Sequence, residues 1–174
     1  MNIVDRYDIS GKGKLTGAAA PRSTAKQGMV IAMEIERNPM SLSDEHLMAV
    51  MQQWRKLHSV GSRDKDSSPL QLSEKIDRAK EQAAVYREVL TDVGALLSAD
   101  ALAELKAIFS IGRNPEPLEA YPKIISDYRG EFAGVANLDS EIAQLLEKAN
   151  FLTMVCEGLV RLGRDETAAS LRHI

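Results

Sequence analysis

The stretch ANFLTMVCEGLVRLG, residues 149–163, decides the fold class, because its apolar residues recur at helical spacing. Steps of four and three, which keep residues on one face of an α-helix, continue back through the preceding residues. The members of this row are Leu138, Ile142, Leu145, Ala149, Leu152, Cys156, Leu159 and Gly163. A second apolar row, which contains Phe151 and Val155, widens the face. We therefore expect one long helix that begins at Asp139 or Ser140, ends at Gly163 and lies in the centre of the core.

Cys156 is the only cysteine of the chain and lies within this row. A free cysteine usually behaves as a small buried hydrophobe, whereas a reactive thiol needs exposure and a nearby base or positive charge. Its place on the apolar row favours the core interpretation, with thiol catalysis as the alternative. A single cysteine forms no internal disulfide, which is typical of a reducing compartment.

A separate apolar row, in another part of the chain, runs through residues 72–97 and follows a heptad pattern. Its members are Leu72, Ile76, Ala79, Ala83, Tyr86, Leu90, Val93 and Leu97. Alanines in such a row indicate that a neighbouring helix approaches closely. The neighbour is either another helix of the same domain, a second copy of the chain or a different protein.

The rest of the chain completes the prediction of an all-α fold. Ser43 and Ser98 are expected to cap further helices, and Pro122 suits the first turn of another. We expect orthogonal or bundle-like packing of about five helices over residues 40–174. Residues 10–28, SGKGKLTGAAAPRSTAKQG, contain no acidic residue and few large apolar ones. Residues 1–39 are therefore expected to form an extended N-terminal arm, flexible or ordered by a partner.

Composition excludes several classes of function. The net charge of −3 gives no overall attraction to nucleic acid. No apolar run is long enough for a membrane span, and the start MNIVDRYDIS does not resemble a cleavable signal peptide. We expect a cytoplasmic protein, or one exported by a dedicated secretion system.

No motif for catalysis, a metal or a cofactor occurs in the sequence. The zinc pattern HExxH, the pattern CxxC and the calcium-loop pattern are all absent. GKGKLTG, residues 11–17, lacks the spacing of a phosphate-binding loop. We therefore expect no catalytic, cofactor or metal site and no cofactor.

Five residues are candidates for contact with a partner. Trp54 is the only tryptophan, a residue type enriched at interaction hot spots, although its helical spacing also suits the core. The other four lie at expected helix ends and turns, where ion pairing within the chain is the simpler explanation. They are Arg113, Asp127, Arg129 and Glu131.

Three stretches resemble segments of a small proteobacterial family of uncharacterised helical proteins: LQLSEKIDRAKEQA (70–83), LSADALAELKAIFSIGR (97–113) and QLLEKANFLTMVCEGLVRLG (144–163). The similarity includes a turn at Ile111, Gly112 and Arg113 and a helix end of the form Glu-Gly-Leu-x-x-Leu-Gly. The chain departs from the family pattern at Ser110, where tryptophan is usual, and at Asn114-Pro115, where Gly-Asp is usual. The resemblance covers roughly residues 70–163 and implies a small helical domain, without an assigned activity.

Two functions follow as hypotheses. The first is a non-enzymatic helical module that binds a protein partner or a second copy of itself, as an adaptor, an assembly factor or a secretion helper. The second is a small-molecule-binding or catalytic domain whose site is built from dispersed polar residues at helix ends, such as Arg113, Asp127, Tyr128, Arg129 and Glu131. The absence of any catalytic motif favours the first hypothesis.

Overall fold

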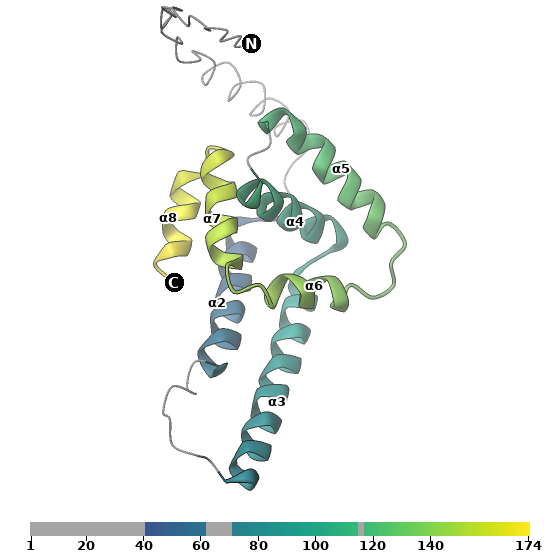
Figure 1. Cartoon of the computed structure of the whole chain (residues 1–174). Helices are drawn as coiled ribbons and strands as arrows, with labels where there is room; N and C mark the ends of the chain where they lie inside the picture. The colour runs from purple at the N-terminus through teal and green to yellow at the C-terminus, as the bar shows by residue number, and fades with distance from the viewer. Residues whose placement is uncertain (1–40, 62–70, 115–116) are drawn as a thin grey trace, which may run out of the picture.

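The structure is a computed structural model that describes residues 41–61, 71–114 and 117–174. These residues form seven α-helices and one short 3-10 helix, and no strand occurs among them, which confirms the all-α fold (Figure 1). The α-helices are α2 (Asp44–Gly61), α3 (Leu72–Leu96), α4 (Ala99–Arg113), α5 (Tyr121–Phe132), α6 (Asp139–Leu146), α7 (Phe151–Arg161) and α8 (Asp165–Arg172). The 3-10 helix η2 (Leu118–Ala120) leads into α5. The expected arm, residues 1–39, lies outside the described residues.

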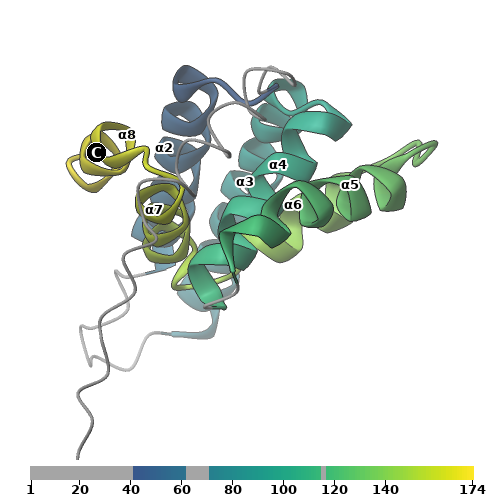
Figure 2. The ribbon, with the colours of Figure 1, turned by 90° about the horizontal axis from the view of Figure 1, so that it is seen from above.

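The centre of the domain is the pair α4 and α7, with α5 and α8 on opposite sides of it (Figure 2). α4 begins at Ser98, whose Oγ accepts a hydrogen bond from the Ala101 amide at 3.1 Å, as the sequence predicts for a helix cap. A side chain of α7 caps the C-terminal end of α4. Arg161 Nη1 donates to the carbonyl oxygens of Ile111 at 2.6 Å and Asn114 at 2.8 Å. These carbonyls have no partner within the helix itself, so the side chain joins the two helices.

α2 and α3 form an antiparallel pair beside this centre. Gln53 donates to Asp92 at 3.1 Å, and Lys56 pairs with Glu88 at 2.8 Å, so positions that rise along α2 meet positions that fall along α3. Val89 and Val93 of α3 are fully buried. α3 is longer than α2, and its N-terminal turns extend past the end of α2 (Figure 1).

The prediction of one helix over residues 139–163 is wrong, and the described residues form seven α-helices where about five were expected. The segment divides into α6 and α7, because residues 147–150 form an exposed turn. The Phe151 amide donates to the Lys148 carbonyl in this turn at 3.0 Å. The Trp54 indole NH also donates to that carbonyl, at 3.2 Å. α8 then follows Gly163, whose φ of +77° ends α7 as predicted.

Cys156 is buried, with 2% of its surface exposed, as its place on the apolar row predicts. Its Sγ lies 3.7 Å from the Ala168 carbonyl oxygen, so it contributes to the contact between α7 and α8. Burial raises the pKa of the thiol, although the charge of Arg172 acts in the opposite direction. The thiolate is therefore disfavoured, which agrees with a packing role.

Candidate interaction surfaces

The predicted apolar row of α3 is buried only in its C-terminal half. Val93 and Leu97 are buried, while Leu72 and Ile76 are 74% and 47% exposed. Ala79 and Ala83 are also exposed. We call these four exposed residues, Leu72, Ile76, Ala79 and Ala83, the α3 strip. Of the three neighbours that the sequence left open, a helix of the same domain therefore covers only the second half of the row, and a second copy or a different protein remain for the first half.

A groove of about 570 Å³ lies between α2 and α3 and joins the α3 strip. Ala79 and Ala83 belong to both, and Leu57 and Val60 form the opposite wall. Tyr86 lines the groove as well, and its hydroxyl donates to Glu147 at 2.9 Å. Burial, followed by the hydrogen bond and charge of Glu147, raises the pKa of Tyr86. The groove is thus a mostly apolar hollow whose tyrosine is held in place.

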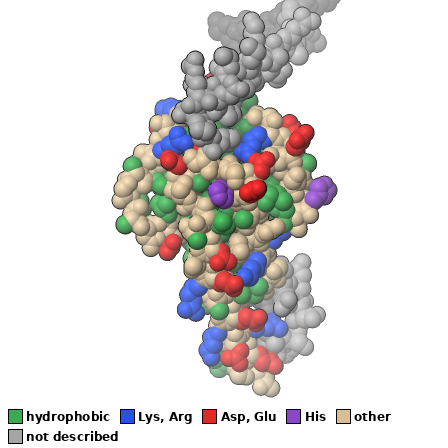
Figure 3. Space-filling view, turned by 180° about the vertical axis from the view of Figure 1, so that it is seen from behind, with side chains coloured by type: hydrophobic (Ala, Val, Ile, Leu, Met, Phe, Trp, Pro, Cys, Tyr) green, Lys and Arg blue, Asp and Glu red, His purple; other side chains and the backbone are tan. Residues whose placement is uncertain are grey.

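Charged side chains surround the strip without covering it. Figure 3 shows acidic and basic groups mixed along the narrow projection at the bottom of the molecule. Residues 72–83 carry three acidic and three basic side chains, which balance to zero: Glu74, Asp77, Glu81, Lys75, Arg78 and Lys80. Lys75 and Lys80 fall beside the strip in the heptad pattern, whereas Glu74 and Glu81 fall on the opposite face. The strip is therefore a narrow apolar surface with basic edges.

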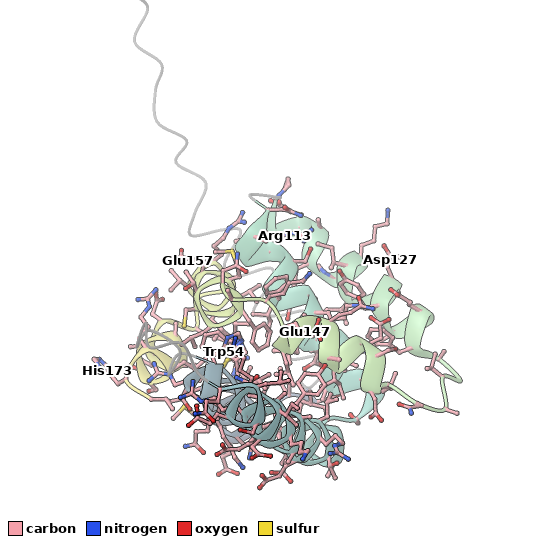
Figure 4. All side chains as sticks on the ribbon, turned by 60° about the horizontal axis from the view of Figure 1, so that its bottom comes forward. Trp54, Arg113, Asp127, Glu147, Glu157 and His173 are labelled. Atoms are coloured by element: carbon pink, nitrogen blue, oxygen red, sulfur yellow. The ribbon has the colours of Figure 1, made fainter. Side chains whose placement is uncertain are left out.

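Trp54, the first candidate contact residue, packs against other residues of the domain. Its ring lies 4.5 Å from the ring of His58 and 6.4 Å from that of Phe151, centre to centre, and its NH is bonded to Lys148. Figure 4 shows Trp54 in the middle of the domain, with Arg113 and Asp127 at its edge. The indole joins α2 to the turn between α6 and α7.

Arg129 forms an ion pair within the chain, which is the simpler explanation that the sequence offered, but its partner, the buried Glu104, was not predicted. Its Nη2 donates to Glu104 at 3.1 Å, and its Nε lies 3.2 Å from Asp100. Glu104 is only 2% exposed and also accepts hydrogen bonds from the backbone amides of Ser41 and Leu42, both at 2.9 Å. One carboxylate thus joins α4, α5 and the start of the described chain. Its spacing of three from Ala101 and four from Ile108 places it on the buried face, which is the signal that could have identified it.

Arg113 lies at the edge of a small cleft between α4, α5 and α6, of about 190 Å³. Tyr128 and Lys148 line the same cleft. Lys106 within it is paired with Glu141 at 2.7 Å and lies 4.9 Å from the ring centre of Tyr128. The cleft brings together two of the polar residues that the second hypothesis groups, Arg113 and Tyr128.

Asp127 and Glu131 are exposed on α5 and do not line this cleft, and Arg129 is engaged with Glu104. The five polar residues of the second hypothesis therefore do not form one site. Within the described residues, no cluster of three or more His, Cys, Asp or Glu side chains has the geometry to hold a metal ion. None of the helices in those residues is both long and apolar enough to span a membrane.

No protein-family model, curated protein or solved structure matches this chain. The resemblance of residues 70–163 to a helical proteobacterial family therefore stays a prediction. The function has to be argued from the surfaces described above.

Proposed function

We propose that the protein is a non-enzymatic helical module that binds a protein helix on its α3 strip. The supporting observation is the strip itself, in which Leu72 and Ile76 stand exposed at helical spacing beside an apolar groove. Exposed apolar surface costs roughly 25 cal/mol for each Å² that a partner could cover. Contiguous apolar patches of this kind mark interaction sites.

The domain holds this surface in a fixed position. Val89 and Val93 anchor the C-terminal half of α3 in the core. Side-chain bonds from Gln53 and Lys56 of α2, and from Tyr86 to Glu147, fix its middle. A preordered surface loses less conformational entropy when it binds. The helical core is thus suited to presenting the strip to a partner.

Site-specific photo-cross-linking tests this function. A benzoylphenylalanine at position 82 of the full chain lies at the edge of the strip, where Gln82 lines the groove, and one at position 81 lies on the face opposite the strip. We expect a cross-linked protein adduct from position 82 that disappears when Ile76→Lys is added, and none from position 81. Equal adducts from both positions, or none from either, would refute the proposal.

The kind of module, whether adaptor, assembly factor or secretion helper, is part of the same proposal. Residues 1–39 are the predicted arm, and deleting residues 1–28 tests the secretion form of the idea. If export or partner binding is unchanged by the deletion, the arm has no such role. A cytoplasmic location of the module is likewise part of the proposal.

A second candidate function is binding of a small anion in the cleft beside Arg113. The observation that favours it is that Arg113 and Lys148 line one cleft with Tyr128. Trp54 reports on this region, because its NH is bonded to the Lys148 carbonyl. Titration with inorganic phosphate should change the Trp54 fluorescence in a saturable way, and Arg113→Ala should abolish the change. A linear response that Arg113→Ala leaves unaltered would reject this candidate.

A further inference from the structure

We propose that the α3 strip binds a second copy of this chain, whose own α3 strip lies antiparallel to it. This inference rests on the proposed function and commits it to one occupant. Three properties of the strip favour a second copy: the order of its large and small residues, the charges at its edges, and the groove at its end.

The large and small residues of the strip are complementary to themselves when two strips run antiparallel. A two-fold interface pairs residue i with residue j and residue j with residue i. With the axis between residues 77 and 78, Ile76 of each copy faces Ala79 of the other, and Leu72 of each copy faces Ala83 of the other. Both pairs set a large side chain against a small one, so the helices can approach closely and interlock. A parallel arrangement would instead set Ile76 against Ile76 and leave Ala79 against Ala79.

Charge favours the same arrangement. In an antiparallel pair of heptad helices, each edge meets the equivalent edge of the other helix. Ser73 then faces Lys80, and Lys75 faces Gln82, so no two like charges meet. In a parallel pair, Lys75 of one copy would face Lys80 of the other, which is repulsive. Residues 72–83 also have no net charge, so two strips do not repel each other overall.

The groove accommodates the end of the second helix. Leu72 of the second copy faces Ala83, which is a wall of the groove between α2 and α3. Leu57 and Val60 line the other side and can bury the leucine. The N-terminal turns of α3 extend past the end of α2 (Figure 1), and Leu72 and Ile76 on these turns are exposed to a second helix. Residues 72–83, which carry the strip, span about 18 Å of helix, so we expect a small interface and a dimer that depends on concentration.

Sedimentation analysis of the full chain over a range of concentrations up to 1 mM tests the inference. We expect a monomer–dimer equilibrium. Ile76→Lys should raise its dissociation constant at least about 30-fold, the effect of losing a central interface residue. Glu81→Gln adds the same unit of charge on the opposite face and should leave the constant unchanged. Because Ile76 is exposed, the variant should keep the circular dichroism spectrum of the parent.

Ala79→Ile distinguishes the antiparallel register from other apolar association. It sets isoleucine against isoleucine in both central pairs, so it should weaken the dimer, and adding Ile76→Ala should restore it. A dimer that Ala79→Ile strengthens, or that Ile76→Lys does not affect, overturns the inference. So does a chain that stays monomeric at 1 mM. If the chain is monomeric but position 82 cross-links a different polypeptide, the second copy is refuted and the proposed function stands. If position 82 yields no adduct, both are refuted.

Discussion

Gly112 of α4 and Gly158 of α7 lie against each other where the two central helices cross. A Cβ atom on Gly112 would stand 1.8 Å from the Met154 carbonyl oxygen and 2.8 Å from the Gly158 nitrogen. A Cβ atom on Gly158 would stand 2.1 Å from the Ile108 carbonyl oxygen. The backbones therefore touch directly, and each glycine provides the space that the other helix occupies.

Alanine at either position should destabilise the domain. Gly112→Ala or Gly158→Ala forces the helix backbones apart, and overpacking of this kind costs about 1–3 kcal/mol or more. The free energy of unfolding, measured by urea denaturation, should fall by at least that amount. Gly130→Ala on α5 is the matched control, because nothing lies within 4 Å of its Cβ position. It should instead gain about 0.5–1 kcal/mol from lower backbone entropy in the unfolded state. Equal effects at the three sites would contradict the close crossing.

Neutralising Glu104 should destabilise the domain as well. Glu104→Gln removes the buried charge that Arg129 and two backbone amides share, and weakening the bonds of a buried charged group in this way costs about 1–3 kcal/mol. Urea denaturation of Glu104→Gln, Arg129→Met and the double variant gives the coupling between the two side chains. Glu131→Gln, an exposed carboxylate on the helix that carries Arg129, should change stability by less than about 0.5 kcal/mol. A loss of the same size in Glu131→Gln would show that the effect is not specific to the buried pair.

Tyr121 should make the protein less stable in alkali. Its side chain is 2% exposed, and its hydroxyl has no hydrogen-bond partner among the described residues. Burial, followed by the charge of Glu104, raises its pKa above the ordinary value of 10.0. The folded protein therefore keeps a proton that the unfolded chain releases. The contribution of Tyr121 to the free energy of unfolding is therefore fully present below about pH 10. It decreases as the pH rises from there toward the higher pKa of the folded protein.

Tyr121→Phe removes this titration together with the unpaired hydroxyl. At pH 7 the variant should be as stable as the parent or gain up to about 1 kcal/mol. Its decline above pH 10 should be shallower than that of the parent, when both are followed by urea denaturation in alkaline buffers. A parallel decline of the two proteins would exclude Tyr121 as the source.

The thiol of Cys156 should react slowly in the folded protein. It is buried and its pKa is raised, so both access and ionisation are low. DTNB should label it at a small fraction of the rate seen in denaturant, and Cys156→Ala should abolish the signal. Rapid labelling of the folded protein would instead favour the reactive-thiol alternative.

Helical periodicity predicted the all-α fold but not where each helix ends. The row of apolar residues continues without interruption from Leu145 through Ala149 to Leu152, yet the chain turns between Leu146 and Phe151. Residues 147–150 contain no proline or glycine that would break a helix locally. The Lys148 carbonyl in this turn accepts the Trp54 indole NH, a bond from a helix far away in the sequence. No local pattern could indicate it.

The sequence likewise predicted only part of the candidate surface on α3. The heptad pattern identified the apolar face of α3, and the face exists, but the pattern does not say what covers it. Val89 is buried although it lies outside the predicted row. Leu72 and Ile76 lie within the row but are exposed, because the N-terminal turns of α3 extend past the C-terminal end of α2. The burial of Glu104 is likewise a consequence of where Arg129 and the amides of Ser41 and Leu42 meet in the fold.

By itself the sequence determined that the fold is helical, that Ser98 caps α4, that Gly163 stops the chain from continuing α7, and that Cys156 is buried. These depend on interactions within a few residues and on which side chains water disfavours, and both can be read along the chain. Only the tertiary structure decided which apolar face is covered, which carboxylate is paired, and that two glycines bring α4 and α7 into contact. Those outcomes depend on which distant segments meet.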